Sequence, residues 1–466
     1  MVETVHRLVR IGFYAPLLFS TALAFAEDDA GEVSIPSLQP APASAANALT
    51  SNSTGDANQV AVLTNADTAI TGTRLRPSAN TRRTLNNYLD EIERVETEFG
   101  AYGNGLAEQL SGLGEAYQII GRHDDAIEVF KRAAHINRIN EGLYNLNQVP
   151  IMENMIESLV ARGQWQDANE RREYLYWLYK RNYGQWDPRM LPVMDSLSNW
   201  YLNVYAMNRN NGSALALMDA YDLFSDSVKI INDTYGEKDL RKAGALRGLT
   251  ISNWYFNTYQ YIEPRDDFGN NINYSQKEAI DRGQRLTTYI SNSYVRGKAA
   301  ITELVDLYAD NPNAPPGSEA GAMVELGDWY MLFNKWRSAI DTYQEAHNML
   351  QENSNDEVRH QIDKLFSRPV ALPDLPLMET TNNAGSEEEL VGDPEDTAHD
   401  YVVVSFDVTR FGSVRNVDIL ESIPEDSIRN RTRVKNALKN AKFRPRFVDG
   451  QPVLTEHVTQ RYVFND

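Results

Sequence analysis

The stretch YVVVSFDVTRFGSV, from Tyr401 to Val414, decides the fold of the C-terminal part of the chain. One alternate set of its side chains is entirely apolar: Val402, Val404, Phe406 and Val408. A period of two is the period of a strand that turns one face toward a core. Gly412 then marks a turn, and the chain resumes as a second strand over Val414–Leu420. The stretch therefore predicts two consecutive strands joined by a short turn.

The residues after this pair of strands predict a helix and a closing strand. PEDSIRNRTRVKNALKNAKF begins with acids and ends with bases, as the helix dipole favours. Its apolar residues stand at helical spacing: Ile428, Val434, Ala437, Leu438 and Ala441. A turn at Asp449-Gly450 then precedes a strand over Val453–Phe464. Residues 400–466 are thus predicted to form a small α+β domain in the order strand, strand, helix, strand.

A repeat precedes this domain and predicts the fold of the body. The first copy reads Leu110-x2-Leu113-Gly114-x2-Tyr117, then Ala126-x3-Phe130-x2-Ala133. The last copy reads Met323-x2-Leu326-Gly327-x2-Tyr330, then Ala339-x3-Tyr343-x2-Ala346. Both copies resemble the tetratricopeptide repeat, in which small residues let two antiparallel helices approach and large residues fill the space between them.

Looser copies lie between these two. SNWY at Ser198–Tyr201 recurs at Ser252–Tyr255, and Tyr183-Gly184 recurs at Tyr235-Gly236. Residues 81–366 are therefore predicted to form an all-α helical solenoid of about a dozen helices, whose concave face binds an extended protein or peptide partner. Most of the seven tryptophans are expected to pack between repeat helices; the positions of Trp200 and Trp254 stay open at this stage.

Three further segments are assigned from composition. Residues 1–26 read as a secretory signal peptide, with a basic start, a short apolar run and the small-x-small site Ala24-Phe25-Ala26. A retained inner-membrane anchor is the alternative, although the apolar run is shorter than the ~20 residues of a membrane span. Residues 27–80 are rich in small polar residues and are expected to be disordered. Residues 367–399, proline-rich and then acidic, are expected to be a flexible linker that tethers the C-terminal domain without fixing it.

Charge and cysteine content limit the classes of partner. The net charge is −20, but the residues from Tyr401 onward are mildly basic, so nucleic acid is not expected as the partner of the whole chain. The chain has no cysteine, so no disulfide is expected in an exported protein and no lipid anchor on cysteine. The expected location is the periplasm.

No catalytic signature is visible in the sequence. There is no phosphate-binding glycine loop, no nucleophile elbow and no zinc-binding helix motif, and the seven histidines are scattered. The neighbouring acids Asp124-Asp125 stand at an expected helix start, where they complement the dipole. The protein is therefore expected not to be an enzyme, with no cofactor, no metal site and no small-molecule substrate.

The C-terminal domain resembles the C-terminal domain of TonB, the energy transducer of Gram-negative envelopes. The likeness covers about 65 residues and includes the strand order and the closing aromatic strand. The residues that carry it are Val404-x-Phe406-x-Val408, Gly412-x-Val414-x3-Asp418-Ile419, Ala437-Leu438, Phe443-Arg444-Pro445, Gly450-x-Pro452-Val453 and Tyr462-Val463-Phe464. Unlike TonB, this chain has repeats where TonB has a long proline-rich spacer.

The resemblance implies a function and a site. In that family the domain captures a short segment of an outer-membrane receptor as an added strand. By carry-over, the capturing edge is the last strand, with Val458, Thr459, Gln460, Arg461 and Tyr462 beside the captured peptide. Arg444, Arg446 and Arg461 form an expected basic face that attracts an acidic segment.

Two roles follow from this site. One is a periplasmic accessory of TonB-dependent transport across the outer membrane, with a TonB-dependent receptor or the inner-membrane transducer complex as partner. The other is an envelope scaffold without a transport role. A retained anchor would instead favour an energy transducer.

Overall fold

The computed structural model describes residues 79–207, 214–259, 276–309, 311–353, 355–373, 400–425 and 427–464. The predicted signal peptide, nearly all of the predicted disordered segment and most of the predicted linker lie outside the described residues. The chain divides into two compact units, whose described parts are 79–182 and 183–464; they are called here the N-terminal and the C-terminal unit.

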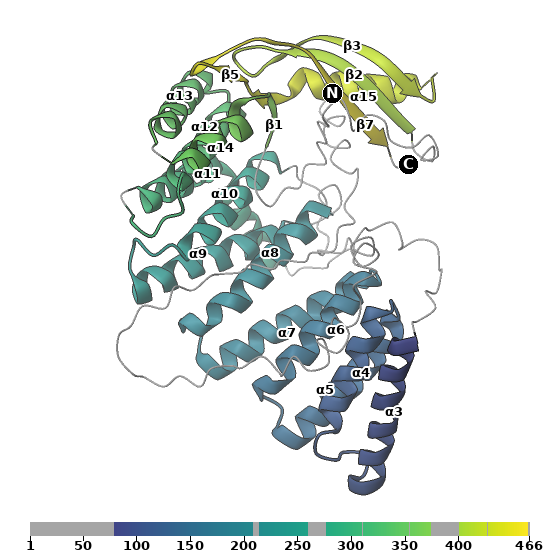
Figure 1. Ribbon diagram of the computed structural model, residues 1–466. Helices are drawn as coiled ribbons and strands as arrows, with labels where there is room; N and C mark the ends of the chain where they lie inside the picture. Colours follow the sequence, from purple (N-terminus) through teal and green to yellow (C-terminus); the bar gives the residue numbers. More distant parts are fainter. Residues whose placement is uncertain are drawn as a thin grey trace. The chain divides into compact units, whose positions relative to one another are not determined.

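The N-terminal unit consists of helices, and its first four α-helices pack in chain order (Figure 1). Its elements are α3 (Ala79–Phe99), α4 (Leu106–Ile119), α5 (His123–Glu141), the short 3-10 helix η4 (Leu146–Gln148), α6 (Val149–Ala161) and α7 (Trp165–Tyr183).

The C-terminal unit continues with helices and ends in strands (Figure 1). Its helices are the 3-10 helix η5 (Pro188–Met190), α8 (Leu191–Met207), α9 (Leu215–Tyr235), α10 (Lys242–Thr258), α11 (Gln276–Tyr308), α12 (Ser318–Leu332), α13 (Trp336–Glu352), α14 (Asp356–Phe366) and α15 (Ile428–Asn440). Its strands are β1 (Val370–Leu372), β2 (Asp400–Val408), β3 (Val414–Ile423), β4 (Lys442–Arg444), β5 (Phe447–Val448), β6 (Gln451–Pro452) and β7 (Thr455–Phe464).

The two clear repeat copies form helix pairs of the tetratricopeptide type. The first copy is the pair α4 and α5, and the last copy is the pair α12 and α13. A Cβ atom at Gly114 would lie 2.5 Å from the Phe130 ring, and one at Gly327 would lie 2.4 Å from the Tyr343 ring. These distances are below van der Waals contact, so the glycine of each copy makes room for the large ring of the second helix. The helical body is therefore a TPR-like solenoid, as the repeat predicted.

The looser copies share one type of turn between helices, of which the sequence repeat showed only the Tyr-Gly pair. Tyr183 and Tyr235 stand at the ends of α7 and α9, each followed by a glycine. Three residues after each glycine, an aspartate pairs with an arginine, Arg189 in one copy and Arg241 in the other. Each guanidinium also lies over the tyrosine ring of its own turn, at 4.0 and 3.5 Å from the centroid.

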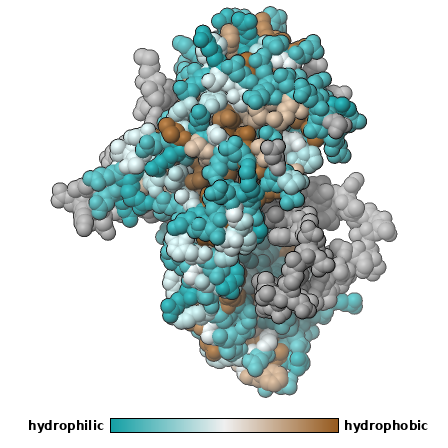
Figure 2. Space-filling view, turned by 90° about the vertical axis from the view of Figure 1, so that its left-hand side faces the viewer, coloured by the Kyte–Doolittle hydropathy of each residue, from teal (hydrophilic) through white to brown (hydrophobic). Residues whose placement is uncertain are grey.

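Tryptophans divide between the core and the surface. Trp200 is buried in α8, and Trp254 in α10 is half-buried with its ring against Phe333. Trp177, Trp186 and Trp336 are exposed. The space-filling view shows hydrophobic residues in small groups on a mostly hydrophilic surface (Figure 2). Among the described helices, none combines the length and the apolar character that a bilayer span requires.

The C-terminal domain is a three-stranded antiparallel sheet with one helix. The strand order is β3-β2-β7, so β2 is the central strand, and α15 packs on β2 and β3. The core contains every apolar residue of the predicted alternating set, together with residues of the helix and of later strands: Val402, Val404, Phe406, Val408, Val434, Leu438, Phe443 and Phe464. Ile428, one of the apolar residues at helical spacing, is 78% exposed at the first turn of α15.

Candidate functional site

β7 is an outer strand of the sheet. It pairs with β2 on one side, with Val458 opposite Phe406 and Gln460 opposite Val404. No described strand pairs with its other side. The five residues that the resemblance assigned to partner capture, Val458–Tyr462, therefore lie together on a strand at a sheet edge. An outer strand presents backbone N–H and C=O groups on which a further strand can pair.

Side chains of β7 alternate between the core and solvent. Gln460 is buried and accepts a hydrogen bond from the Tyr462 hydroxyl at 3.0 Å, whereas Thr459 and Arg461 are exposed. Burial raises the pKa of Tyr462 above its ordinary value. The strand is therefore attached to the core through one face, and its other face is available for side-chain contacts with a partner.

Arg461 takes part in a contact that crosses all three strands. Its guanidinium lies 3.9 Å from the centroid of the Tyr401 ring in β2. The Tyr401 hydroxyl donates a hydrogen bond of 2.6 Å to Glu421 in β3. Stacking holds Arg461 over the ring but leaves its in-plane N–H groups directed along the surface.

Near its start, β7 has an irregular backbone beside β2. His457 has a φ of 57°, and its backbone N–H donates to Asp407 Oδ1 at 3.0 Å. The pairing of β2 with β7 shifts register between Phe406 and Val408. Such bulges are common at sheet edges, where they bend the strand and limit unwanted pairing. The regular part of the edge is thus the segment from Val458 to Phe464.

Arg444 does not belong to a surface basic face, so this part of the sequence prediction is wrong. Its side chain is 3% exposed, and it forms a two-point ion pair with Asp328 of α12, itself 2% exposed. Arg444 Nη2 donates to Asp328 Oδ2 at 2.6 Å and Nε donates to Oδ1 at 2.9 Å. Nη1 donates to the Leu365 carbonyl at 3.2 Å. Arg446, two residues later, is exposed, and its role in binding stays a prediction.

The ion pair belongs to an interface that joins the C-terminal domain to the last repeat. Phe447 of β5 lies in one core cluster with residues of α12, α13 and α14, and its ring centroid is 4.9 Å from that of Phe366. Tyr343 of α13 donates a hydrogen bond of 2.6 Å to Asp328 Oδ1. Figure 1 shows β5 beside α13 in the same region. Aromatic packing and a buried charge pair thus hold the domain against the repeats.

A short strand completes this interface, and it lies within the first residues of the predicted linker. Residues 370–372 form β1, which pairs antiparallel with β4, so that Val370 lies opposite Arg444. The predicted flexible coil began at residue 367, and at these first residues that prediction is wrong. The physical reason is that β4 offers unpaired backbone groups beside the end of α14, which stabilise the neighbouring chain as a strand. The C-terminal domain is therefore fixed to the last repeat.

The pKa of Tyr343 gives a test of the interface. Burial and the negative charge of Asp328 raise the pKa of Tyr343 well above its usual value of 10. The folded state therefore keeps the proton that the unfolded chain loses above about pH 10, and stability is expected to fall there by up to about 1.4 kcal/mol per pH unit. Tyr343→Phe should fall less steeply, although it starts about 1 kcal/mol lower at neutral pH because one buried hydrogen bond is lost. Denaturant unfolding between pH 8 and 11 measures both; equal alkaline slopes would show that Tyr343 ionises alike in both states.

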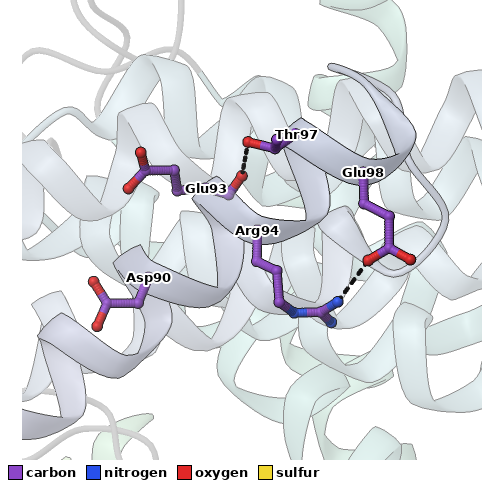
Figure 3. Close-up of a pocket in the computed structure, with 5 residues that line it drawn as sticks. All are labelled: Asp90, Glu93, Arg94, Thr97 and Glu98. Atoms are coloured by element: carbon purple, nitrogen blue, oxygen red, sulfur yellow. Dashed lines mark hydrogen bonds and ion pairs between the residues drawn. The ribbon is translucent and has the colours of Figure 1, made fainter.

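A shallow pocket on α3 shows no arrangement for chemistry. Its lining residues all come from one helix: Asp90, Glu93, Arg94, Thr97 and Glu98 (Figure 3). Arg94 pairs with Glu98 at 2.7 Å, and the Thr97 hydroxyl donates to the Glu93 carbonyl at 2.8 Å. These are contacts within one solvated helix face. Across the part of the chain that the structure describes, no group of three or more histidines, aspartates or glutamates could hold a metal ion.

Sequence reasoning missed the residues of the repeat that receive the domain. Asp328 follows directly after the Leu326-Gly327 pair of the last copy, within a helix whose neighbouring residues are buried. A carboxylate at such a position requires a partner, which is a signal that the sequence contained. The partner, Arg444, lies 116 residues further along the chain, so its identity was not accessible from the pattern.

Comparison with known proteins assigns the C-terminal domain. No curated protein matches the chain. Among solved structures, the chain is similar to BtubC from P. vanneervenii at 14% identity, covering 60% of this chain and 95% of that one, with a TM-score of 0.34. It is also similar to a Podosopora anserina protein with nearly identical TPR-like repeats at 15% identity, covering 55% and 95%, with a TM-score of 0.34. Residues 395–465 match the family model of the Gram-negative bacterial TonB protein C-terminal, so that a TonB C-terminal domain follows the TPR-like helical region of this chain.

Proposed function

We propose that this protein is a non-enzymatic adaptor of the Gram-negative envelope, in which the TonB C-terminal domain captures an extended segment of a partner protein. The observation that carries the proposal is the position of β7 as an outer strand in a domain of this family. In β-strand addition, backbone hydrogen bonds supply affinity and alternate side chains supply selectivity. Thr459 and Arg461 are the exposed side chains that such a strand would meet first.

The partner we propose is the periplasmic segment of an outer-membrane TonB-dependent receptor, with the protein acting in the periplasm. The repeats bind a second envelope protein, since TPR-like helices commonly serve as protein-binding surfaces. The docked interface supports an adaptor role, because a domain fixed by a buried ion pair and strand pairing presents its edge in a constant orientation. A constant orientation reduces the entropy that is lost when both partners bind at once.

Two adjacent proline substitutions test strand capture. The pairs Phe406–Val458 and Ser405–Thr459 are neighbours in the antiparallel ladder between β2 and β7. In such a ladder, hydrogen-bonded and non-hydrogen-bonded pairs alternate, so one of the two β7 residues directs its N–H toward β2 and the other directs it outward. We expect one of Val458→Pro and Thr459→Pro to destabilise the domain by about 3 kcal/mol, and the other to fold but to lose capture.

Capture is measured with the labelled periplasmic segment of a TonB-dependent receptor, by fluorescence anisotropy on the full chain. Thr459→Ala is the matched control, because it removes one side-chain contact but keeps the backbone donor, and it should lose less affinity than the folded proline variant. A folded proline variant with unchanged binding would exclude the edge of β7 as the binding site. Normal growth of a deletion strain on nutrients that such receptors import would favour the scaffold role over transport.

A further inference from the structure

The docked interface creates an exposed aromatic pair. Trp336, the first residue of α13, contacts Phe411 of the turn between β2 and β3, with ring centroids 4.8 Å apart and the rings at 60°. The two side chains are 40% and 38% exposed. The pair exists only because the C-terminal domain lies against the last repeat, since one ring comes from each. Exposed tryptophan and phenylalanine in contact are typical of protein-binding surfaces.

Two arginines flank this pair. The Arg337 guanidinium lies 4.9 Å from the centroid of Trp336, and the Arg410 guanidinium lies 4.7 Å from that of Phe411. Both arginines are exposed. Within the residues that the structure describes, no carboxylate lies within ion-pairing distance of either one. A guanidinium stacked by its face keeps its in-plane N–H groups for a ligand.

Elsewhere the same molecule shows what such a stacked arginine holds. Four other arginines lie over tyrosine rings at 3.5–4.5 Å. Three of them also bind an aspartate at 2.7–2.9 Å, and the fourth is Arg461 of β7. The three sets with an aspartate are Arg122 with Tyr117 and Asp125, Arg189 with Tyr183 and Asp187, and Arg241 with Tyr235 and Asp239. At the exposed pair, Arg337 lies over Trp336 and Arg410 lies over Phe411. No described residue supplies a carboxylate to either arginine.

We propose that Trp336, Arg337, Arg410 and Phe411, called here the junction patch, bind an acidic peptide segment of a protein partner. Each guanidinium donates to one carboxylate of the peptide in the two-point geometry that two of the internal sets show at Asp187 and Asp239. An apolar side chain between the two acids packs on the exposed rings. This site is separate from the edge of β7, so it provides the protein with a second partner-binding surface.

An acidic peptide fits this patch better than an anionic membrane. The chain carries a net charge of −20, which repels a negatively charged bilayer. The same charge acts weakly on a short peptide, because salt at about 0.1 M screens charges that are more than about 10 Å apart. The two rings also pack edge to face on each other, so neither is free to insert among lipids. Positive charge near the patch also comes from Lys335, which lies over Tyr294.

The test uses the full chain and a short labelled peptide that alternates glutamate with leucine. We expect Arg337→Glu and Arg410→Glu each to weaken binding about tenfold and the double variant about a hundredfold, with binding falling as salt rises. A counterpart peptide with glutamine should not bind. Arg429→Glu, an exposed charge reversal on α15, is the matched control and should change affinity less than about twofold. Arg337→Gln and Arg410→Gln remove the charge without adding repulsion. Each should also weaken binding, and the double glutamine variant should weaken it more.

Three results would overturn the proposal. The first is unchanged peptide affinity in the double variant, and the second is an equal loss in Arg429→Glu, which would mean a general charge effect. The third is arginine-dependent binding to phosphatidylglycerol vesicles without binding to the peptide. The folded proline variant of β7 should bind the acidic peptide normally, so failure here and failure of strand capture are separate outcomes.

Discussion

Arg444→Ala is expected to lower the free energy of unfolding of the C-terminal unit by about 3–5 kcal/mol, because it leaves the Asp328 carboxylate buried without its counter-charge. Asp328→Ala should cost about as much for the reciprocal reason. Hydrogen exchange at β1 and β4 is expected to rise sharply in both variants, since undocking exposes the strand pair that these residues flank. Denaturant unfolding of the full chain measures the first effect, and exchange by mass spectrometry locates the second.

The double variant Asp328→Asn/Arg444→Gln separates charge from packing. It keeps polar side chains of similar size while removing both charges, so it should cost less than either alanine variant. Arg359→Ala is the control, because its ion pair with Asp356 is exposed and should contribute less than about 1 kcal/mol. If Arg444→Ala were as mild as Arg359→Ala, the domain would not depend on this pair for its docking.

Gly412→Ala is expected to destabilise the C-terminal domain by at least about 3 kcal/mol. Gly412 has a φ of 71°, and a Cβ atom there would lie 2.0 Å from the Phe443 carbonyl oxygen, a backbone atom with little freedom to move. The close approach is held from both sides, because Phe443 N–H donates to the Gly412 carbonyl and Gly412 N–H donates to the Thr409 carbonyl, each at 2.9 Å. An alanine must therefore separate the turn from β4.

Gly450→Ala is the matched control for this prediction. Gly450 lies in the same domain with a φ of 72°, so the backbone strain of the substitution is similar. The nearest atom to its Cβ would be His347 Nδ1 at 3.4 Å, close to ordinary contact and belonging to a side chain. The control should cost only about 1 kcal/mol of left-handed strain. Equal losses of stability in thermal or denaturant unfolding would mean that the positive φ, and not the contact with Phe443, causes the destabilisation by Gly412→Ala.

Local sequence was enough to predict the long strands and the helix of the C-terminal domain, but not its short strands β4, β5 and β6. The alternation of Val402, Val404, Phe406 and Val408 predicted a strand with one buried face, and all four side chains are fully buried in β2. The turn at Asp449-Gly450 joins β5 and β6, with positive φ at both residues. These features depend on residues a few positions apart, where spacing alone carries the information. The repeat body was predicted for the same reason, because its motif lies within one helix pair.

Local pattern failed where a side chain depends on a distant partner. Arg444 was assigned to a basic face that attracts an acidic segment, yet it is buried against Asp328 and the Leu365 carbonyl. Residues 370–372 were assigned to a flexible linker from their prolines and polar neighbours, yet they pair with β4. Neither contact produces a periodic pattern in the sequence, because each joins segments that are far apart in the chain.

The sequence by itself determined the repeat helices, the two long strands, the helix and the closing strand of the C-terminal domain, and the resemblance to the TonB C-terminal domain that placed the last strand at a sheet edge. Only the tertiary structure decided that this domain is fixed to the last repeat, and that fixing it brings Trp336 and Phe411 together. The reason is physical: periodic burial is encoded along one element, whereas a docked interface is the sum of pairings between elements, each selected by shape and charge in three dimensions.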